Sequence, residues 1–197
     1  IPGIEKSHAI ENIRLAAEKL RGKDVKPDEF YGMVFQDSDV AKWIEAAAYA
    51  LAAGEDPELE KAVDETIQLY GASQHEDGYV DSYFTVKCPD KMWTNICDAH
   101  ELYCAGHMME AAVAYYEVTG KRELLDIMSK SADCIYEQFM KKNTRAYPGH
   151  PEVELALMRL WRATGNEKYK ELAKHFVDVR GQAPNYFVEE KKNRGWN

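Results

Sequence analysis

The sequence lacks a long hydrophobic run and an excess of positive charge. Its longest apolar run, Ala46–Ala53, is far too short to cross a bilayer. The formal net charge at pH 7 is −9, from 34 acidic and 25 basic residues, and such a surface repels phosphate groups. We therefore predict that the chain does not span a membrane and that neither nucleic acid nor an anionic membrane is its partner.

The four cysteines lack the paired spacing of a zinc ribbon and are too sparse for a disulfide scaffold. They are Cys88, Cys97, Cys104 and Cys134. We expect free thiols in a reducing compartment, the cytoplasm. The sequence also has no glycine-rich phosphate loop and no serine nucleophile elbow, which argues against the enzyme classes that depend on them.

What the sequence does contain is a threefold internal repeat. Each copy consists of an alanine-rich apolar segment, a glycine and then a charged amphipathic segment. The glycines are Gly54, Gly120 and Gly165, and we expect each to form a left-handed helix C-cap with a new helix a few residues later. The repeat therefore predicts three antiparallel helical hairpins.

The two helices of each hairpin differ in polarity. From Val40 to Ala53 only Lys42 and Glu45 carry charge, which predicts a helix buried on every side. The charged partners instead have one apolar stripe each, and these stripes are Leu59, Val63, Ile67 and Tyr70; Leu125, Met128, Ala132, Ile135 and Phe139; and Tyr169, Leu172, Ala173, Phe176 and Val177. Inner helices wrapped by outer helices indicate an all-α fold, with the helical hairpins of an (α/α)6-type toroid.

The links between hairpins predict where a ligand site lies. Links within hairpins are short, whereas residues 74–98 and 141–151 form long links between them. If the hairpins stack side by side, the long links meet at one end of the ring. Loops carried by a rigid scaffold often hold binding residues, so we expect a ligand site at that end.

A stripe of polar residues begins one helix beside the first long link. His100, Tyr103, His107 and Glu110 follow one another at spacings of three and four. His100 and His107 are about 10 Å apart along a helix and cannot ligate one ion, so no metal site is predicted. We interpret His100, in the first turn, as part of a hydrogen-bonding wall at the ring mouth, with a capping or packing role as the alternative. His107 is expected to be a core histidine with its hydrogen bonds satisfied.

Three further residues are candidates for the same site. His150 is expected at a helix N-cap, with Pro151 at the first helical position; the acids that follow, Glu152 and Glu154, suit the helix dipole. Trp43 is either a sugar-stacking platform or a core residue. Asp77 lies in an Asp-Gly-Tyr turn. An acid, histidines and aromatic rings around a concave mouth would suit recognition of a polyol.

Four segments, in this order, resemble one known family. They are Asp37–Ala46, Gln74–Tyr79, His100–His107 and Tyr147–Glu152. Together they resemble the N-terminal half of the catalytic domain of glycoside hydrolase family 127, the bacterial β-L-arabinofuranosidases, over about residues 35–190. In that family the domain is an (α/α)6 toroid, which agrees with the hairpins predicted from the repeat.

The resemblance implies retaining hydrolysis of β-linked L-arabinofuranosides by a cysteine nucleophile at a zinc site, with a glutamate as general acid/base. By position, His100 and His150 resemble the substrate-binding histidines of the family, and Trp43 would line the same pocket. The family's zinc ligands, nucleophile and acid/base lie in the later half of a longer chain. We therefore expect no catalytic and no metal-binding residue in this segment, and zinc only in the full-length family member.

Three or four hairpins cannot close a ring of six. Residues 1–197 are thus predicted to form a single all-α domain, the N-terminal part of a longer catalytic domain, that binds an L-arabinofuranoside-type saccharide and is an enzyme only as part of that domain. The open toroid edge predicts self-association. Two alternatives stay open: another α/α-toroid sugar enzyme, such as an uronyl hydrolase or a sugar epimerase, and a non-enzymatic helical-repeat interaction protein.

Overall fold

The computed structural model describes residues 7–142 and 146–183, together with Val188, Lys191 and Lys192. Its elements are α2 (Ala9–Leu20), η1 (Pro27–Glu29), α3 (Asp37–Ala53), α4 (Pro57–Ala72), α5 (Ser82–Lys87), η2 (Pro89–Lys91), α6 (Glu101–Thr119), α7 (Glu123–Tyr136), the π-helical turn η3 (Glu137–Lys141), α8 (Val153–Thr164) and α9 (Glu167–Gly181). These residues include no β-strand and no helix that is long and apolar enough to span a membrane. The predicted all-α class is confirmed.

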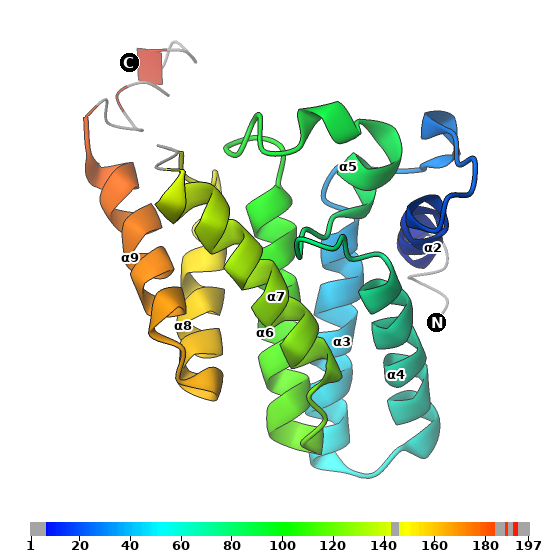
Figure 1. Cartoon of the computed structure of the whole chain (residues 1–197). Helices are drawn as coiled ribbons and strands as arrows, with labels where there is room; N and C mark the ends of the chain where they lie inside the picture. Colours follow the sequence, from blue (N-terminus) through cyan, green and yellow to red (C-terminus); the bar gives the residue numbers. More distant parts are fainter. Residues whose placement is uncertain (1–6, 143–145, 184–187, 189–190, 193–197) are drawn as a thin grey trace.

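The hairpins are α3–α4, α6–α7 and α8–α9, and they form two layers (Figure 1). In the inner row α6 lies between α3 and α8. In Figure 1 α7 crosses in front of α6, whereas α4 and α9 lie beside α3 and α8 at the two sides. α7 also contacts both α4 and α9, so these three helices form the outer row. The inner and outer arrangement predicted from the polarity of the helices is therefore confirmed.

Burial along α3 differs from the prediction. The helix packs against α6, α2 and α4, yet Lys42, Ala46, Ala50 and Tyr49 are exposed, Tyr49 by 54%. Because no described helix covers this side, the expectation of burial on every side is wrong for α3. It holds far better for α6, which is flanked by inner helices on both sides and buries almost every residue from Glu101 to Tyr115.

The outer helices bury their apolar stripes as predicted, with one clear exception. The stripe of α4 reaches the core at Val63, Ile67 and Tyr70, and those of α7 and α9 do so likewise. Val177, however, is 58% exposed. It follows the fully buried Phe176, and one residue turns the side chain by about 100° around the helix, so only one of the two can face α8.

Two of the three hairpin glycines form the predicted left-handed cap. Gly120 has φ 73° and Gly165 has φ 74°. Gly54 has φ 176° and is extended, so the prediction is wrong there. The next helix begins at once after Asp56, whose carboxylate accepts a hydrogen bond from the Leu59 N–H at 3.0 Å. An extended backbone at Gly54 is therefore enough to place Asp56 at the N-cap of α4.

Both helices next to the candidate histidines begin later than predicted. α6 begins at Glu101, because His100 itself has a left-handed backbone (φ 63°) that cannot continue a helix. α8 begins at Val153, and Glu152 is its N-cap in place of His150. The prediction placed His100 within the first turn of its helix and Pro151 at the first position of the next, and both placements are wrong.

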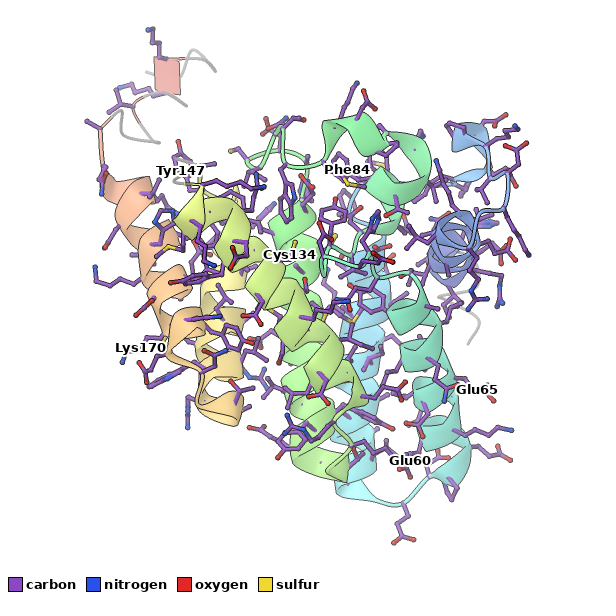
Figure 2. The ribbon with its side chains drawn as sticks, in the orientation of Figure 1. Glu60, Glu65, Phe84, Cys134, Tyr147 and Lys170 are labelled. Atoms are coloured by element: carbon purple, nitrogen blue, oxygen red, sulfur yellow. The ribbon has the colours of Figure 1, made fainter. Side chains whose placement is uncertain are left out.

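The long links gather at one end of the hairpins, as predicted. Figure 2 labels Phe84 and Tyr147 at that end and Glu60 at the opposite end, by the α3–α4 turn. The first link contains α5, which is tied to α3 through buried groups. The Asp37 carboxylate, at the start of α3, accepts hydrogen bonds from the Ser82 backbone N–H at 2.7 Å and from the Ser82 hydroxyl.

Candidate functional site

The structure brings His100 and His150 together. Their ring centroids lie 5.1 Å apart, although the residues are far apart in the chain and precede different inner helices. Tyr103, in the first turn of α6, lies 5.6 Å from the His100 ring and 4.9 Å from the His150 ring. Phe35, just before α3, lies 5.3 Å from His100. The cluster lies at the long-link end of the inner helices, where a ligand site was predicted.

The hydrogen bond of His100 determines what its ring can offer to a ligand. Nδ1 lies 2.6 Å from the carbonyl oxygen of Asp98. A carbonyl oxygen can only accept, so Nδ1 carries a hydrogen and donates it. In the neutral ring Nε2 then has a free lone pair. His100 therefore presents a hydrogen-bond acceptor beside His150.

Lys42 adds a cation to the same cluster. Its ammonium donates to the Tyr103 hydroxyl at 2.9 Å and to the Ser38 hydroxyl at 3.2 Å. The sequence analysis did not single out Lys42 as a site residue. The signal was present, because a lysine in an otherwise apolar inner helix needs water or a polar partner at that position. The cluster thus combines donors, acceptors and ring faces.

His107 lies below this cluster on the inner face of α6. Its ring centroid is 4.5 Å from that of Tyr103. Nδ1 lies 3.2 Å from Glu152 Oε1, and the two side chains are 17% and 19% exposed. Burial, followed by the charge of Lys42, lowers the pKa of His107 to about 4. His107 is therefore neutral near pH 7, with Nδ1 beside the Glu152 carboxylate. It is not a core residue, because its side chain is 17% exposed, and the prediction that its hydrogen bonds are satisfied stays a prediction.

The role of Glu152 also differs from the expected dipole role of a first-turn acid. Its carboxylate lies 3.2 Å from Nδ1 of His107, on the neighbouring helix. The close approach of α6 and α8 depends on Gly106, because a Cβ atom there would lie 2.9 Å from Glu152 Cγ and 3.0 Å from the Val153 nitrogen. Glu154, the second first-turn acid, is buried and pairs with Arg180 of α9.

An ionic network lies further down the inner face. Arg159 of α8 contacts Glu110 of α6 and lies 3.3 Å from Glu45 of α3. Burial raises the pKa of Glu110, while the hydrogen bond and charge of Arg159 oppose the shift. This network links the three inner helices. It also gives Glu110, the last residue of the predicted polar stripe, a structural partner.

Trp43 and Asp77 have other described surroundings than the histidine cluster. Trp43 is partly buried and packs against the main hydrophobic core. Asp77 is exposed, accepts from the Tyr79 N–H at 3.0 Å, and lines a cavity of about 360 Å³ together with Trp93 and Cys134 of α7. No described hydrogen bond or ring contact joins either residue to His100 or His150. Their predicted roles in substrate binding stay predictions.

Metal ligation finds no support in the part of the chain that the structure describes. Within those residues no group of three histidine, cysteine or acidic side chains is placed to hold an ion. No disulfide joins any of the four cysteines, of which Cys104 and Cys134 are buried. The donor set for a zinc site is thus not assembled by these residues.

Comparisons with known proteins identify relatives over nearly the whole sequence. A family model described as β-L-arabinofuranosidase, GH127 catalytic domain, matches residues 4–195. A non-reducing end β-L-arabinofuranosidase of Bifidobacterium longum subsp. longum is 43% identical over 195 residues, which cover 95% of this chain and 28% of that protein. The chain therefore spans little more than a quarter of the length of this relative.

Solved structures agree with this similarity. The crystal structure of a GH127 β-L-arabinofuranosidase from Geobacillus stearothermophilus T6 matches with a TM-score of 0.82 and 52% identity, over 100% of this chain and 30% of that one. A second GH127 β-arabinofuranosidase has a TM-score of 0.82 and 34% identity, over 94% of this chain and 31% of that one. These enzymes have toroid-like α/α folds, which supports the predicted toroid architecture.

Proposed function

The chain belongs to the glycoside hydrolase family 127 catalytic-domain family of β-L-arabinofuranosidases, and from this premise we propose that it supplies a sugar-binding wall to a retaining hydrolase of β-linked L-arabinofuranosides. The observation that carries the proposal is the contact between His100 and His150, 5.1 Å apart at the end where the long links meet. Both residues lie in segments that resemble the family.

The chemistry of the cluster suits a neutral sugar. Each hydroxyl of a furanose can donate one hydrogen bond and accept others. His100 offers an acceptor at Nε2, Lys42 and Tyr103 offer donors, and Phe35 offers an apolar ring beside them. One such neutral hydrogen bond contributes about 0.5–1.5 kcal/mol, which is roughly a threefold to tenfold change in affinity.

The bond-breaking groups are proposed to lie outside this chain. The nucleophilic cysteine, the acid/base glutamate and the zinc ligands of the family belong to the later half of a longer protein. The described residues do not assemble a metal donor set, so no catalytic step is assigned to them. This chain would bind and orient the sugar, and activity would require the remainder of the toroid.

A calorimetric titration with L-arabinose tests the proposal. Binding to the chain should be lost or weakened at least threefold in His100→Ala and in His150→Ala. His8→Ala is a matched control, because His8 has the same left-handed backbone as His100 (φ 59° against 63°) and contacts the ring of Tyr31. If the folded wild-type chain does not bind, or if His8→Ala weakens binding as much as the site variants do, the proposal fails.

One observation favours a second candidate, another toroid enzyme that acts on uronic acids. Lys42 brings a positive charge to the cluster, and the carboxylate of a uronic acid would form an ion pair with its ammonium group. D-galacturonate should then bind more tightly than L-arabinose, and Lys42→Met should remove that difference. Equal or weaker uronate binding would leave the arabinofuranoside proposal in place.

We also propose self-association through α3. Its support is the exposed strip that contains Ala46, Tyr49 and Ala50, where small side chains permit close approach of another helix. Sedimentation velocity across a concentration series tests it, with Ala50→Glu as the disrupting variant. A chain that stays monomeric at high concentration would contradict both this proposal and the alternative of an interaction protein.

The cytoplasm remains our proposal for the location. Its support is that no disulfide joins the four cysteines, which is typical of proteins from a reducing compartment. Cell fractionation with antibodies against the chain would test it.

A further inference from the structure

The segment that carries His150 has no regular structure of its own. Residues 146–152 connect to α8 through turns, so other parts of the molecule must determine where the imidazole lies. One contact is at Gly149, where an added Cβ atom would collide with the carbonyl oxygen of Cys97 in the other long link. Pro148 is buried beside it. The second contact comes from the outer layer.

Arg180, in the last turn of α9, contacts this segment. Its guanidinium carbon lies 5.6 Å from the centre of the Tyr147 ring. α9 runs toward the end of the molecule where Figure 2 labels Tyr147. A guanidinium over an aromatic face is a favourable pairing, and it is stronger where water is partly excluded. The Arg180 side chain is only 18% exposed.

Glu154 fixes the position of the Arg180 guanidinium. Arg180 Nη2 donates to Glu154 Oε1 at 2.8 Å, and the Glu154 side chain is only 8% exposed. A buried carboxylate without a charged partner is costly, so the pair resists separation. The series Glu154, Arg180, Tyr147 thus connects the first turn of α8, through the outer helix, to a residue three positions before His150.

From this arrangement we infer that Arg180 is a positioning residue for the sugar site: it holds Tyr147, and thereby places His150 against His100 and Tyr103. The inference rests on the proposed function, because it takes His150 as a sugar-binding residue. It assigns an outer-layer residue that touches no sugar to the affinity of the inner-face site. Neither the histidine motifs nor the stripes of the helices point to this residue.

The test compares Arg180→Ala with Arg122→Ala. Arg122 is a matched control, since it also lies over a tyrosine ring (Tyr116, 5.5 Å) and pairs with an acid (Asp126, 3.0 Å), but at the hairpin-turn end. Arg180→Ala should weaken L-arabinose binding about threefold to tenfold, and Arg122→Ala should leave it unchanged. Because Arg180→Ala also strips a buried acid of its partner, Tyr147→Leu serves as the second variant, which keeps the ion pair and loses the ring contact.

Two further readouts separate positioning from general loosening of the fold. In a His150→Ala background, Tyr147→Leu should cause no additional loss of affinity, because both act through one group. The NMR signal of the His150 ring, which is close to two other rings, should shift in Tyr147→Leu while that of His8 does not. An unchanged His150 signal, or additive losses in the double variant, would overturn the inference.

The same variants distinguish a failure of the proposed sugar site from a failure of the positioning role alone. If His150→Ala binds L-arabinose like the wild type, the proposed sugar site fails. If His150→Ala loses affinity while Arg180→Ala and Tyr147→Leu do not, only the positioning role fails.

Discussion

Gly106→Ala tests whether the close approach of α6 and α8, beneath the histidine cluster, requires a residue without a side chain. A Cβ atom at this position would lie 2.9 Å from Glu152 Cγ, 3.0 Å from the Val153 nitrogen and 3.1 Å from the Val153 Cα. Two of these three atoms are backbone at the first residue of α8, so they can give way only if the start of that helix moves. The third belongs to the Glu152 side chain, whose carboxylate lies 3.2 Å from Nδ1 of His107.

Two opposing effects determine how much Gly106→Ala changes the free energy of unfolding. Alanine is favoured over glycine inside a helix by about 1 kcal/mol, whereas an extra carbon forced into a packed interface typically costs about 1–3 kcal/mol. Here the obstructing atoms are mostly backbone, so we place the cost at the upper end. The net result is a loss of about 1–2 kcal/mol in the free energy of unfolding, or about 2–8 °C in Tm for a chain of this size.

Urea and thermal unfolding measure this change directly, with Gly181→Ala as the matched control. Gly181 ends α9, and no atom lies within 4 Å of an added Cβ there. The control should therefore be neutral or more stable by up to about 1 kcal/mol. If Gly106→Ala is as stable as Gly181→Ala, the α6–α8 contact tolerates an added carbon. The conclusion that the close approach of these helices depends on Gly106 is then refuted.

Three other predictions concern the core, the buried acids and the thiols. Phe176→Ala should lower the free energy of unfolding by about 3–5 kcal/mol in urea titrations, because the ring is fully buried; a loss below about 1 kcal/mol would contradict that packing. Burial and a neighbouring acid raise the pKa of Asp81 well above its usual value, so its stabilising contribution is complete at low pH and is lost as pH rises through the folded pKa. Asp81→Asn should therefore flatten the fall in stability as pH rises above the usual titration range of a carboxyl group, and an unchanged slope would count against a raised pKa. Burial raises the pKa of Cys134 to about 12 and that of Cys104 well above its usual value, so mass spectrometry should find both alkylated more slowly than the half-buried Cys88; equal rates in the folded chain would contradict this order.

The local sequence pattern was sufficient to predict most of the helical scaffold. Gly120 and Gly165 cap their helices as predicted, because a left-handed residue is a property of the chain at that point. The stripe of Val63, Ile67 and Tyr70 is buried as predicted, because helical periodicity turns a spacing of three and four into one face. The link lengths then predicted which end of the hairpins collects the loops.

The two histidines show how much of the site could be predicted from the sequence. His100 and His150 were predicted at one end of the ring, and the structure brings their rings together. Their backbone states were not predicted, and His100 has a left-handed φ of 63° with its ring bonded to the Asp98 carbonyl oxygen of its own loop. Their role in binding sugar stays a prediction that the titrations above test.

Only the tertiary structure decided what lies opposite each inner helix. The same alanine-rich composition gives α6 an almost complete covering and leaves Tyr49 of α3 exposed, because one helix has inner neighbours on both sides and the other does not. Lys42 of α3 and Glu152 at the start of α8 both meet residues of α6, which are Tyr103 and His107. Periodicity within a segment determines which residues share a face, but the neighbour that meets this face comes from distant parts of the chain, and with it come the burial, the hydrogen bonds and the pKa.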